Sequence, residues 1–212
     1  MLEEKKIIVT GSASGMGEAT LKAYVKAGAN VVGMDISDQK GKDISLNADN
    51  LGPGKCSFIH IDVSDKDSVK KAFDLALDEL KTLDVLAHPA AIQGPADASD
   101  VKVEDWDNMF AVNVRGTMLT NQTAFKYMKK NGSGSIINFG SISGLRPEPS
   151  ASAYSAAKGA VHSWTRTAAG TWGKYNIRVN AILPAIATPM YYAARKRSTE
   201  EENTVAHWRN SV

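Results

Sequence analysis

Short runs of apolar residues alternate with longer segments of helical periodicity along most of this 212-residue chain. The short runs are rich in Ile, Val and Leu, which is typical of strands buried on both faces of a parallel sheet. The longer segments place apolar residues three and four positions apart, as one face of a helix does. Because strands and helices alternate, the pattern predicts a doubly wound α/β fold with helices on both faces of the sheet.

Six strands and four long helices are expected from this pattern. The strands are predicted near residues 6–10, 30–34, 56–62, 83–87, 135–139 and 178–182. The helices are predicted at 15–26, 64–80, 103–129 and 153–174. Between residues 37 and 54, several glycines and asparagines and one proline interrupt the periodicity, so only a short or frayed helix is expected there.

Length and composition indicate a single domain. With 43% hydrophobic residues, the chain is large enough for one core, so residues 1–212 are predicted to form one domain. Residues 187–212 differ from the rest, because they are polar and carry three basic residues at 195–197 followed by three glutamates at 200–202. This segment is predicted to be a mobile lid on the substrate side, although such a charge run is also typical of a solvated helical face.

Charge and cysteine content narrow the class of protein further. The formal net charge of +2 is nearly balanced and the 25 Lys and Arg residues are scattered, so no nucleic acid partner is expected. Cys56 is the only cysteine, which excludes an intrachain disulfide and suits a reducing compartment. Neither a signal peptide nor an apolar stretch of roughly 18 residues is visible. A cytoplasmic protein without a membrane partner is therefore expected.

A glycine-rich turn follows the first predicted strand. It reads Thr10-Gly11-Ser12-Ala13-Ser14-Gly15-Met16-Gly17, and a helical pattern begins at once. Glycines permit a tight strand-to-helix turn and let a pyrophosphate approach the backbone at the amino terminus of the helix. Five residues are therefore expected to contact a dinucleotide: Gly11, Ser14, Gly15, Met16 and Gly17. An ordinary glycine-rich turn is the alternative interpretation.

Two acids follow the next two strands. Asp35 lies eighteen residues beyond Gly17, where a nucleotide-binding fold places the group that meets the adenine ribose. A carboxylate accepts hydrogen bonds from ribose hydroxyls and repels a 2′-phosphate, so Asp35 favours NAD over NADP, unless it is only a solvated strand-end residue. Asp62 and Val63 end the third strand and are expected near the adenine, although Asp62 could equally cap the helix that begins after Ser64.

A tyrosine and a lysine stand four residues apart at the start of the last long helix, which puts Tyr154 and Lys158 on one face. Reduction of a carbonyl needs a proton donor at oxygen while hydride arrives at carbon, and the neighbouring ammonium, with a positive nicotinamide, is expected to lower the pKa of the phenol. Ser141, thirteen residues before Tyr154, could share the substrate oxygen. Each of the three residues alone also has an ordinary structural explanation.

Together these motifs resemble the short-chain dehydrogenase/reductase family. Thr10 to Gly17 match its glycine motif in full, and its catalytic serine, tyrosine and lysine match Ser141, Tyr154 and Lys158. The resemblance implies a Rossmann-type sheet with strand order 3-2-1-4-5-6, and NAD lying across the carboxyl ends of the strands.

The resemblance also implies further site residues. Asn113 would hold a water that links Lys158 to solvent, and Tyr154 and Lys158 would contact the cofactor as well as the substrate. Ile186 and Thr188 would hold the nicotinamide carboxamide. No metal is expected, since tyrosine and serine take the place of a Lewis acid.

Two departures from the family pattern stand out. Where the family shows Asn-Asn-Ala-Gly after strand four, this chain has His88-Pro89-Ala90-Ala91, which is expected to shift the backbone locally. Pro89 and Ala90 are still expected to contact the cofactor, and His88 has no second metal ligand at a suitable spacing. Family members also continue into another helix and a seventh strand, which this chain is expected to lack, either because the sequence is incomplete or because it is naturally shorter.

The expected activity is hydride transfer between NAD(H) and a secondary alcohol or ketone. A non-catalytic NAD-binding sensor or structural subunit is the alternative, and a nucleotide-sugar epimerase is disfavoured by the glycine spacing. The resemblance implies a homodimer or homotetramer paired through the helices at 103–129 and 153–174. The residues expected to line the substrate site mix apolar and charged groups, so a polyol, a cyclic alcohol and a hydroxy acid would fit about equally well. These residues are Ile92, Gln93, Ser143, Leu145, Arg146, Glu148, Tyr191 and Tyr192.

Overall fold

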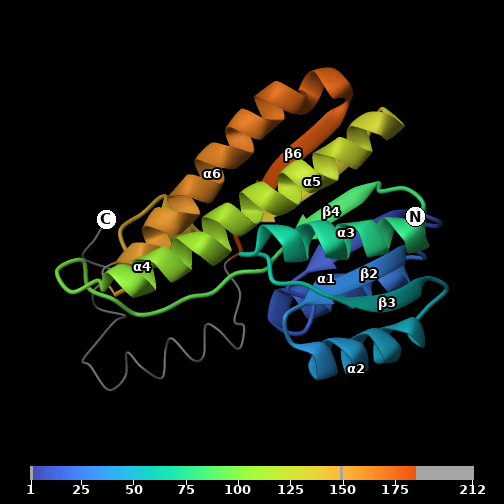
Figure 1. Ribbon diagram of the computed structural model, residues 1–212, viewed down its shortest axis with the longest axis horizontal. Helices are drawn as coiled ribbons and strands as arrows, with labels where there is room; N and C mark the ends of the chain where they lie inside the picture. Colours follow the sequence, from blue (N-terminus) through green and yellow to red (C-terminus); the bar gives the residue numbers. More distant parts are fainter. Residues whose placement is uncertain (1, 149, 185–212) are drawn as a thin grey trace.

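The computed structural model describes residues 2–148 and 150–184 (Figure 1). Within these residues six parallel strands form one sheet in the order β3-β2-β1-β4-β5-β6, which confirms the predicted fold and strand order. The strands are β1 (Lys6–Thr10), β2 (Asn30–Asp35), β3 (Lys55–His60), β4 (Val85–His88), β5 (Gly134–Phe139) and β6 (Ile177–Ile182). Each prediction is close, although β3 ends two residues earlier than expected.

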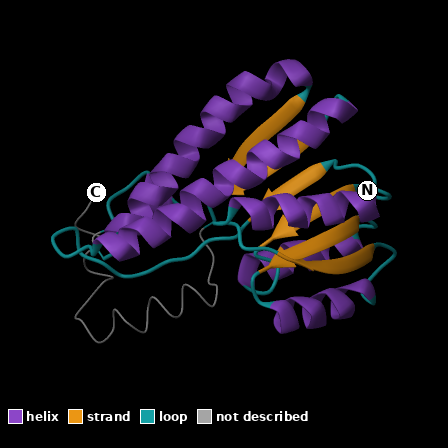
Figure 2. Cartoon of the chain, viewed as in Figure 1, coloured by secondary structure: helices purple, strands orange, loops and turns teal. Residues whose placement is uncertain are grey.

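Helices cover both faces of the sheet (Figure 2). The helices are α1 (Gly15–Lys26), α2 (Asp38–Asp49), α3 (Lys66–Leu80), α4 (Val103–Phe110), α5 (Gly116–Asn131) and α6 (Ser152–Trp172). One core cluster joins α1 and α2 to one face, and a larger cluster joins α3, α5 and α6 to the other. Successive strand residues alternate between the clusters, with Ile7 in one and Ile8 in the other, as a pleated sheet requires.

The helix predicted at 103–129 is present but is not regular along its whole length. A π-helical turn, Ala111–Arg115, separates α4 from α5. The wider turn brings Asn113 inward, where its side chain pairs with the backbone of Ile92 at 2.8 Å in both directions. Such turns are invisible to a hydrophobic pattern of period 3.6, and they frequently occur at functional sites.

The expectation of a short or frayed helix between residues 37 and 54 is wrong. The segment forms a regular twelve-residue helix, α2, whose Ile44 and Ala48 are buried. The helix continues through Gly41, and glycine is needed there because a side chain would collide with the Phe58 ring of β3. The glycine therefore allows the helix to approach the sheet closely.

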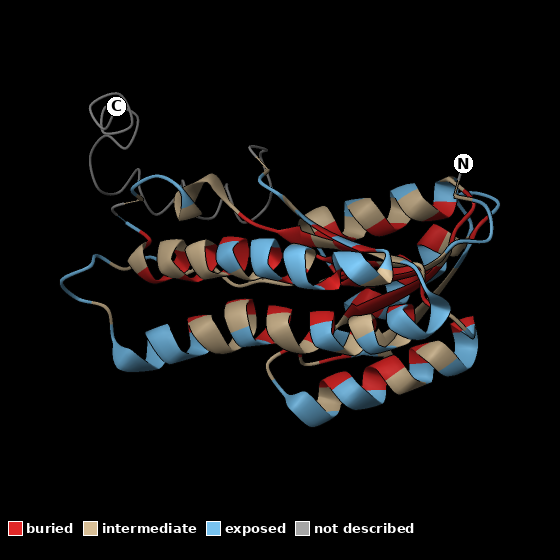
Figure 3. Ribbon diagram, turned by 90° about the horizontal axis from the view of Figure 1, so that it is seen from above, coloured by how far each residue is buried: buried red, intermediate tan, exposed pale blue. Residues whose placement is uncertain are grey.

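Buried residues gather along the sheet and on the helix faces that turn toward it (Figure 3). The strands change direction of progression between β1 and β4, so the carboxyl ends of these two strands leave a crevice between the loops that follow them. None of the helices in the described ranges is long and apolar enough to cross a membrane. The lid predicted for residues 187–212, together with Ile186, Thr188, Tyr191 and Tyr192, lies outside the described residues.

Candidate active site

The glycine turn forms the floor of the crevice. Gly11 and Gly15 adopt positive φ angles of 61° and 54°, which residues with side chains rarely do. A Cβ on Gly17 would collide with the carbonyl oxygen of Gly11, so α1 can pack this closely only with glycine at that position. Ser14 precedes α1 in an extended conformation, and among the described residues its side chain caps none of the first-turn amides. These amides remain free to bind an anion.

A cavity of about 300 Å³ lies over this turn. Ten residues expected to bind the cofactor line it: Gly11, Ser14, Gly15, Met16, Gly17, Asp35, Asp62, Val63, Pro89 and Ala90. The structure thus brings together residues from four separate loops. It adds Ile36, Ile61, Ala91, Ile92 and Val112, which the sequence did not single out for this cavity. Ile36 offered one sequence signal, because it directly follows Asp35, and the structure leaves this apolar residue 62% exposed.

The two acids have different surroundings. The Asp35 carboxylate accepts hydrogen bonds from the Ala13 amide at 3.0 Å and the Ser37 amide at 2.9 Å, which holds it at the edge of the cavity. Asp62 accepts from the amide and the hydroxyl of Ser64 at 2.8 and 2.7 Å. The cap of α3 is Asp65, whose side chain accepts from the Ser68 amide. Asp62 is therefore not the N-cap of that helix.

His88, one of the departures from the family pattern, is explained by its contacts. The buried His88 ring places Nδ1 2.7 Å from the Thr10 hydroxyl and 3.3 Å from the Thr120 hydroxyl, so it links β4 to β1 and α5. Burial, with the charge of Lys158, lowers the pKa of His88 to about 3, and the ring is neutral at physiological pH. Ala90 lies so close to Gly11 that a Cβ on the glycine would come within 2.7 Å of its Cα.

The serine, tyrosine and lysine converge beside the crevice. Ser141 follows β5, while Tyr154 and Lys158 lie one turn apart at the start of α6, both buried. The Lys158 ammonium donates to the Phe139 carbonyl at 2.6 Å and lies 5.6 Å from the centre of the Tyr154 ring. The Ser141 hydroxyl donates to the Ser143 hydroxyl at 3.1 Å.

The pKa of Tyr154 departs from the sequence-based expectation. Burial raises it above its ordinary value of 10.0, a hydrogen bond with Ser141 lowers it in part, and the charge of Glu148 raises it. The expected lowering depended on Lys158 and a positive nicotinamide together. With the protein groups alone, the desolvation of the phenolate is the larger effect, and the Lys158 ammonium is directed at a carbonyl instead.

Burial also lowers the pKa of Lys158, from 10.5 to about 8. Between these values the unfolded chain binds more protons than the folded protein, so the free energy of unfolding should rise with pH from about 8 to 10. In a Lys158→Met variant this rise should be absent. Urea unfolding of both proteins across the range measures the difference, and equal slopes would show that Lys158 is already solvated.

The structure places Asn113 in the π-helical turn, where its side chain contacts the chain that follows β4. It is 1% exposed, and both ends of its side-chain amide pair with the Ile92 backbone. Its own carbonyl accepts from the Thr117 hydroxyl at 2.7 Å. In this arrangement Asn113 fixes the chain at Ile92, which lines the cavity over the glycine turn, and its part in a water-mediated relay stays a prediction.

A carboxylate lies next to the serines of this cluster. The Ser143 hydroxyl donates to Glu148 at 3.4 Å, so a row of polar groups leads from Ser141 through Ser143 to Glu148. Burial raises the pKa of Glu148, and the hydrogen bond with Ser143 partly opposes this effect. Leu145, in contrast, is 62% exposed at the rim.

An open parallel sheet, a glycine-lined cavity at its switch point and an adjacent hydroxyl, phenol and ammonium define a dinucleotide-binding oxidoreductase. The family model of the short chain dehydrogenases matches residues 5–199. The chain therefore belongs to the short-chain dehydrogenase/reductase family, whose members bind nicotinamide cofactors, and it has a dehydrogenase/reductase role.

Individual relatives agree with this assignment. The chain is 36% identical over 190 residues to the 3-oxoacyl-[acyl-carrier-protein] reductase of Thermotoga maritima, covering 89% of this chain and 77% of the relative. It is equally similar to the cyclopentanol dehydrogenase of a Comamonas species, covering 89% and 76%. Among solved structures, the 3-ketoacyl-(acyl-carrier-protein) reductase of Brucella melitensis complexed with NADH matches with a TM-score of 0.84 and 30% identity, covering 91% of this chain and 80% of that one.

Proposed function

We propose that this protein transfers a hydride between NAD(H) and a secondary alcohol or ketone, with Ser141, Tyr154 and Lys158 as catalytic residues. The observation that carries the proposal is the convergence of these three side chains beside the glycine-lined cavity. The cavity fits a dinucleotide, because free helix amides face it and its glycines leave room for phosphates.

The residues divide the proton chemistry between them. Bound NAD supplies the group that accepts the hydride. As the alcohol carbon loses its hydride, the Tyr154 phenolate takes the hydroxyl proton, and in the reverse direction the phenol returns it. The Ser141 hydroxyl holds the substrate oxygen in place, and with the positive nicotinamide bound the Lys158 ammonium would help to stabilise the negative charge on Tyr154. Asn113 completes the proton path to solvent.

The assay that tests the proposal is oxidation of secondary alcohols with NAD, followed at the nicotinamide absorbance. Glu148 favours uncharged substrates, because a second carboxylate beside Ser143 would be repelled. Together with the similarity to a cyclopentanol dehydrogenase, this supports a neutral cyclic alcohol over a hydroxy acid. Turnover of the hydroxy acids alone would contradict this choice of substrate class, and no turnover with any secondary alcohol or ketone would contradict the function.

The position of Asp35 supports NAD as the cofactor. An Asp35→Asn variant keeps one acceptor oxygen but loses the charge that repels a 2′-phosphate, so the preference for NAD over NADP, as a ratio of kcat/KM, should fall by about 10- to 100-fold. Asp38→Asn is the matched control, since Asp38 pairs with His60 and is exposed. An unchanged ratio in Asp35→Asn would remove Asp35 from cofactor selection.

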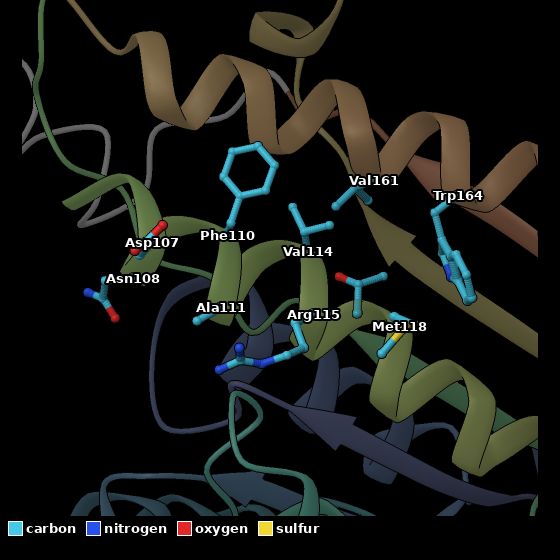
Figure 4. A pocket seen from close by; sticks show the side chains of 10 residues that line it. Asp107, Asn108, Phe110, Ala111, Val114, Arg115, Met118, Val161 and Trp164 are labelled. Atoms are coloured by element: carbon cyan, nitrogen blue, oxygen red, sulfur yellow. The ribbon is translucent and has the colours of Figure 1, made fainter. Parts of the chain in front are cut away.

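We also propose that the protein is cytoplasmic, because a single cysteine suits a reducing compartment. We further propose that it forms a homodimer or homotetramer. A groove of about 780 Å³ lies along the line where α6 packs against the α4–α5 segment, and its walls include Phe110, Val114, Met118 and Trp164 (Figure 4). A groove this apolar suits burial against a second copy. Met118→Glu should shift the protein toward monomer in sedimentation equilibrium. Lys126→Glu, an exposed change on the same helix, should not.

A further inference from the structure

A buried imidazole lies directly behind the loop that carries Ser141. His162 stands one turn after Lys158 on α6 and is 5% exposed. The Ser141 backbone amide donates a hydrogen bond to its Nε2 atom at 3.2 Å. The two residues are twenty-one positions apart, so this contact depends on the packing of α6 against the end of β5.

The loop is shaped around this ring. A Cβ on Gly140 would collide with Nε2 of His162. A Cβ on Gly144 would come within 2.7 Å of the Lys158 and Gly159 backbone and within 2.8 Å of Cε1 of His162. The glycines on either side of Ser141 therefore leave room for the imidazole ring of His162. Ser141 itself has an extended backbone with φ −159° and ψ 151°, which any residue adopts, so the hydrogen bond, not backbone strain, restrains it.

We propose that His162 is a positioning residue for Ser141, whose neutral imidazole holds the Ser141 amide and so directs the serine hydroxyl toward the substrate oxygen. The inference rests on the proposed function, because it gives Ser141 a role in catalysis. His162 is not one of the three proposed catalytic residues, and in this role it does not contact the substrate.

The surroundings keep this ring neutral. Burial lowers the pKa of His162 below 6.5, and the charges of Lys158 and Arg166, one turn to either side on α6, lower it further. The loop after β5 faces the ring with Gly140 and Gly144, and its one carboxylate, Glu148, lies on the other side of Ser143. Leu183, which follows β6, packs beside Gly140. Because Nε2 accepts, the single proton lies on Nδ1, which is buried and has no hydrogen-bond partner among the described residues.

Acid should break the contact. A second proton would go onto Nε2 and set two donors, the imidazolium and the Ser141 amide, against each other. Lowering the pH through the pKa of His162 should therefore release Ser141, and raising it again should restore the hydrogen bond. A glutamine at this position can accept through its Oε1 atom and does not titrate.

Three variants test the role of His162 in catalysis. His162→Leu removes the acceptor and should lower kcat by about 10- to 100-fold in the wild-type background. In a Ser141→Ala background the same change should alter kcat by less than about twofold, because the two residues act as one unit. His162→Gln should recover most of the lost kcat. In carbonyl reduction, where Tyr154 acts as the protonated phenol, it should lack the wild-type fall in activity at acid pH.

The matched control is Thr165→Val on the same helix, which removes a buried polar contact with Asn138 at 3.0 Å and does not touch the loop. It should lower the melting temperature without lowering kcat. Equal losses from His162→Leu in the wild-type and Ser141→Ala backgrounds would overturn the inference. Where His162→Leu fails to fold, a His162→Gln protein that keeps the wild-type acid limb of carbonyl reduction would overturn it equally.

Nitrogen NMR of the ring gives a readout that needs no substrate. It should show Nε2 unprotonated and Nδ1 protonated at neutral pH, and the Ser141 amide resonance should shift as His162 titrates. A protonated Nε2 at neutral pH would overturn the inference even if turnover is normal. The expected spectrum in a protein that oxidises no alcohol would instead contradict the proposed function.

Discussion

Replacing Tyr154 by phenylalanine is expected to lower kcat by about 10³-fold while NAD affinity stays within about twofold of wild type. The variant loses only the hydroxyl that exchanges the proton, and the buried ring keeps its place at the start of α6. The nicotinamide absorbance measures turnover, and calorimetric titration with NAD measures affinity.

The matched control for this change is Tyr175→Phe. Tyr175 packs against Phe125 beyond the far end of α6, away from Ser141 and Lys158, so turnover should be unchanged. A Tyr154→Phe protein that turns over as fast as wild type would remove the phenol from the mechanism. A wild-type protein that binds NAD but oxidises none of the alcohols would favour the alternative of a sensor or structural subunit.

Gly17→Ala is expected to destabilise the fold by about 1–3 kcal/mol and to weaken NAD binding by about 10- to 100-fold. The added methyl group would collide with the backbone carbonyl of Gly11, which cannot rotate away as a side chain can. Either α1 or the glycine turn must move, and both form the floor of the dinucleotide cavity. Chemical unfolding and calorimetric titration measure the two effects.

Gly170→Ala is the matched control, because it makes the same substitution on a helix without a collision. Gly170 is exposed on α6, and a Cβ there would meet no atom within 4 Å. This control should gain up to about 1 kcal/mol from better helix propensity and leave NAD affinity unchanged. Wild-type NAD affinity in Gly17→Ala would place the cofactor elsewhere on the molecule.

Much of the fold followed from local pattern. The strands were found because short Val- and Ile-rich runs are bounded by turns, and the glycine turn because its sequence directly precedes a helical pattern. The spacing of four placed Tyr154 and Lys158 on one helix face without any knowledge of packing. Where the pattern misled, at Gly41 and at the π-helical turn around Asn113, a contact with a distant residue was responsible.

The direction of the pKa shift of Tyr154 could not be predicted from the sequence either. This direction depends on how deeply the phenol is buried and on where the Lys158 ammonium points, and both follow from the docking of α6 on β5. The same docking brings His162 to Ser141, and no spacing rule links two residues in different elements.

The amino-acid sequence by itself determined the alternation of strands and helices, the glycine turn and the order of the candidate catalytic residues, because each depends on backbone preferences and spacings within a few residues. The tertiary structure alone decided which buried groups meet: His162 with Ser141, Asn113 with Ile92 and His88 with Thr10. Burial and hydrogen-bond partners are properties of packed elements, so they set the charge states of these groups only once the chain has folded.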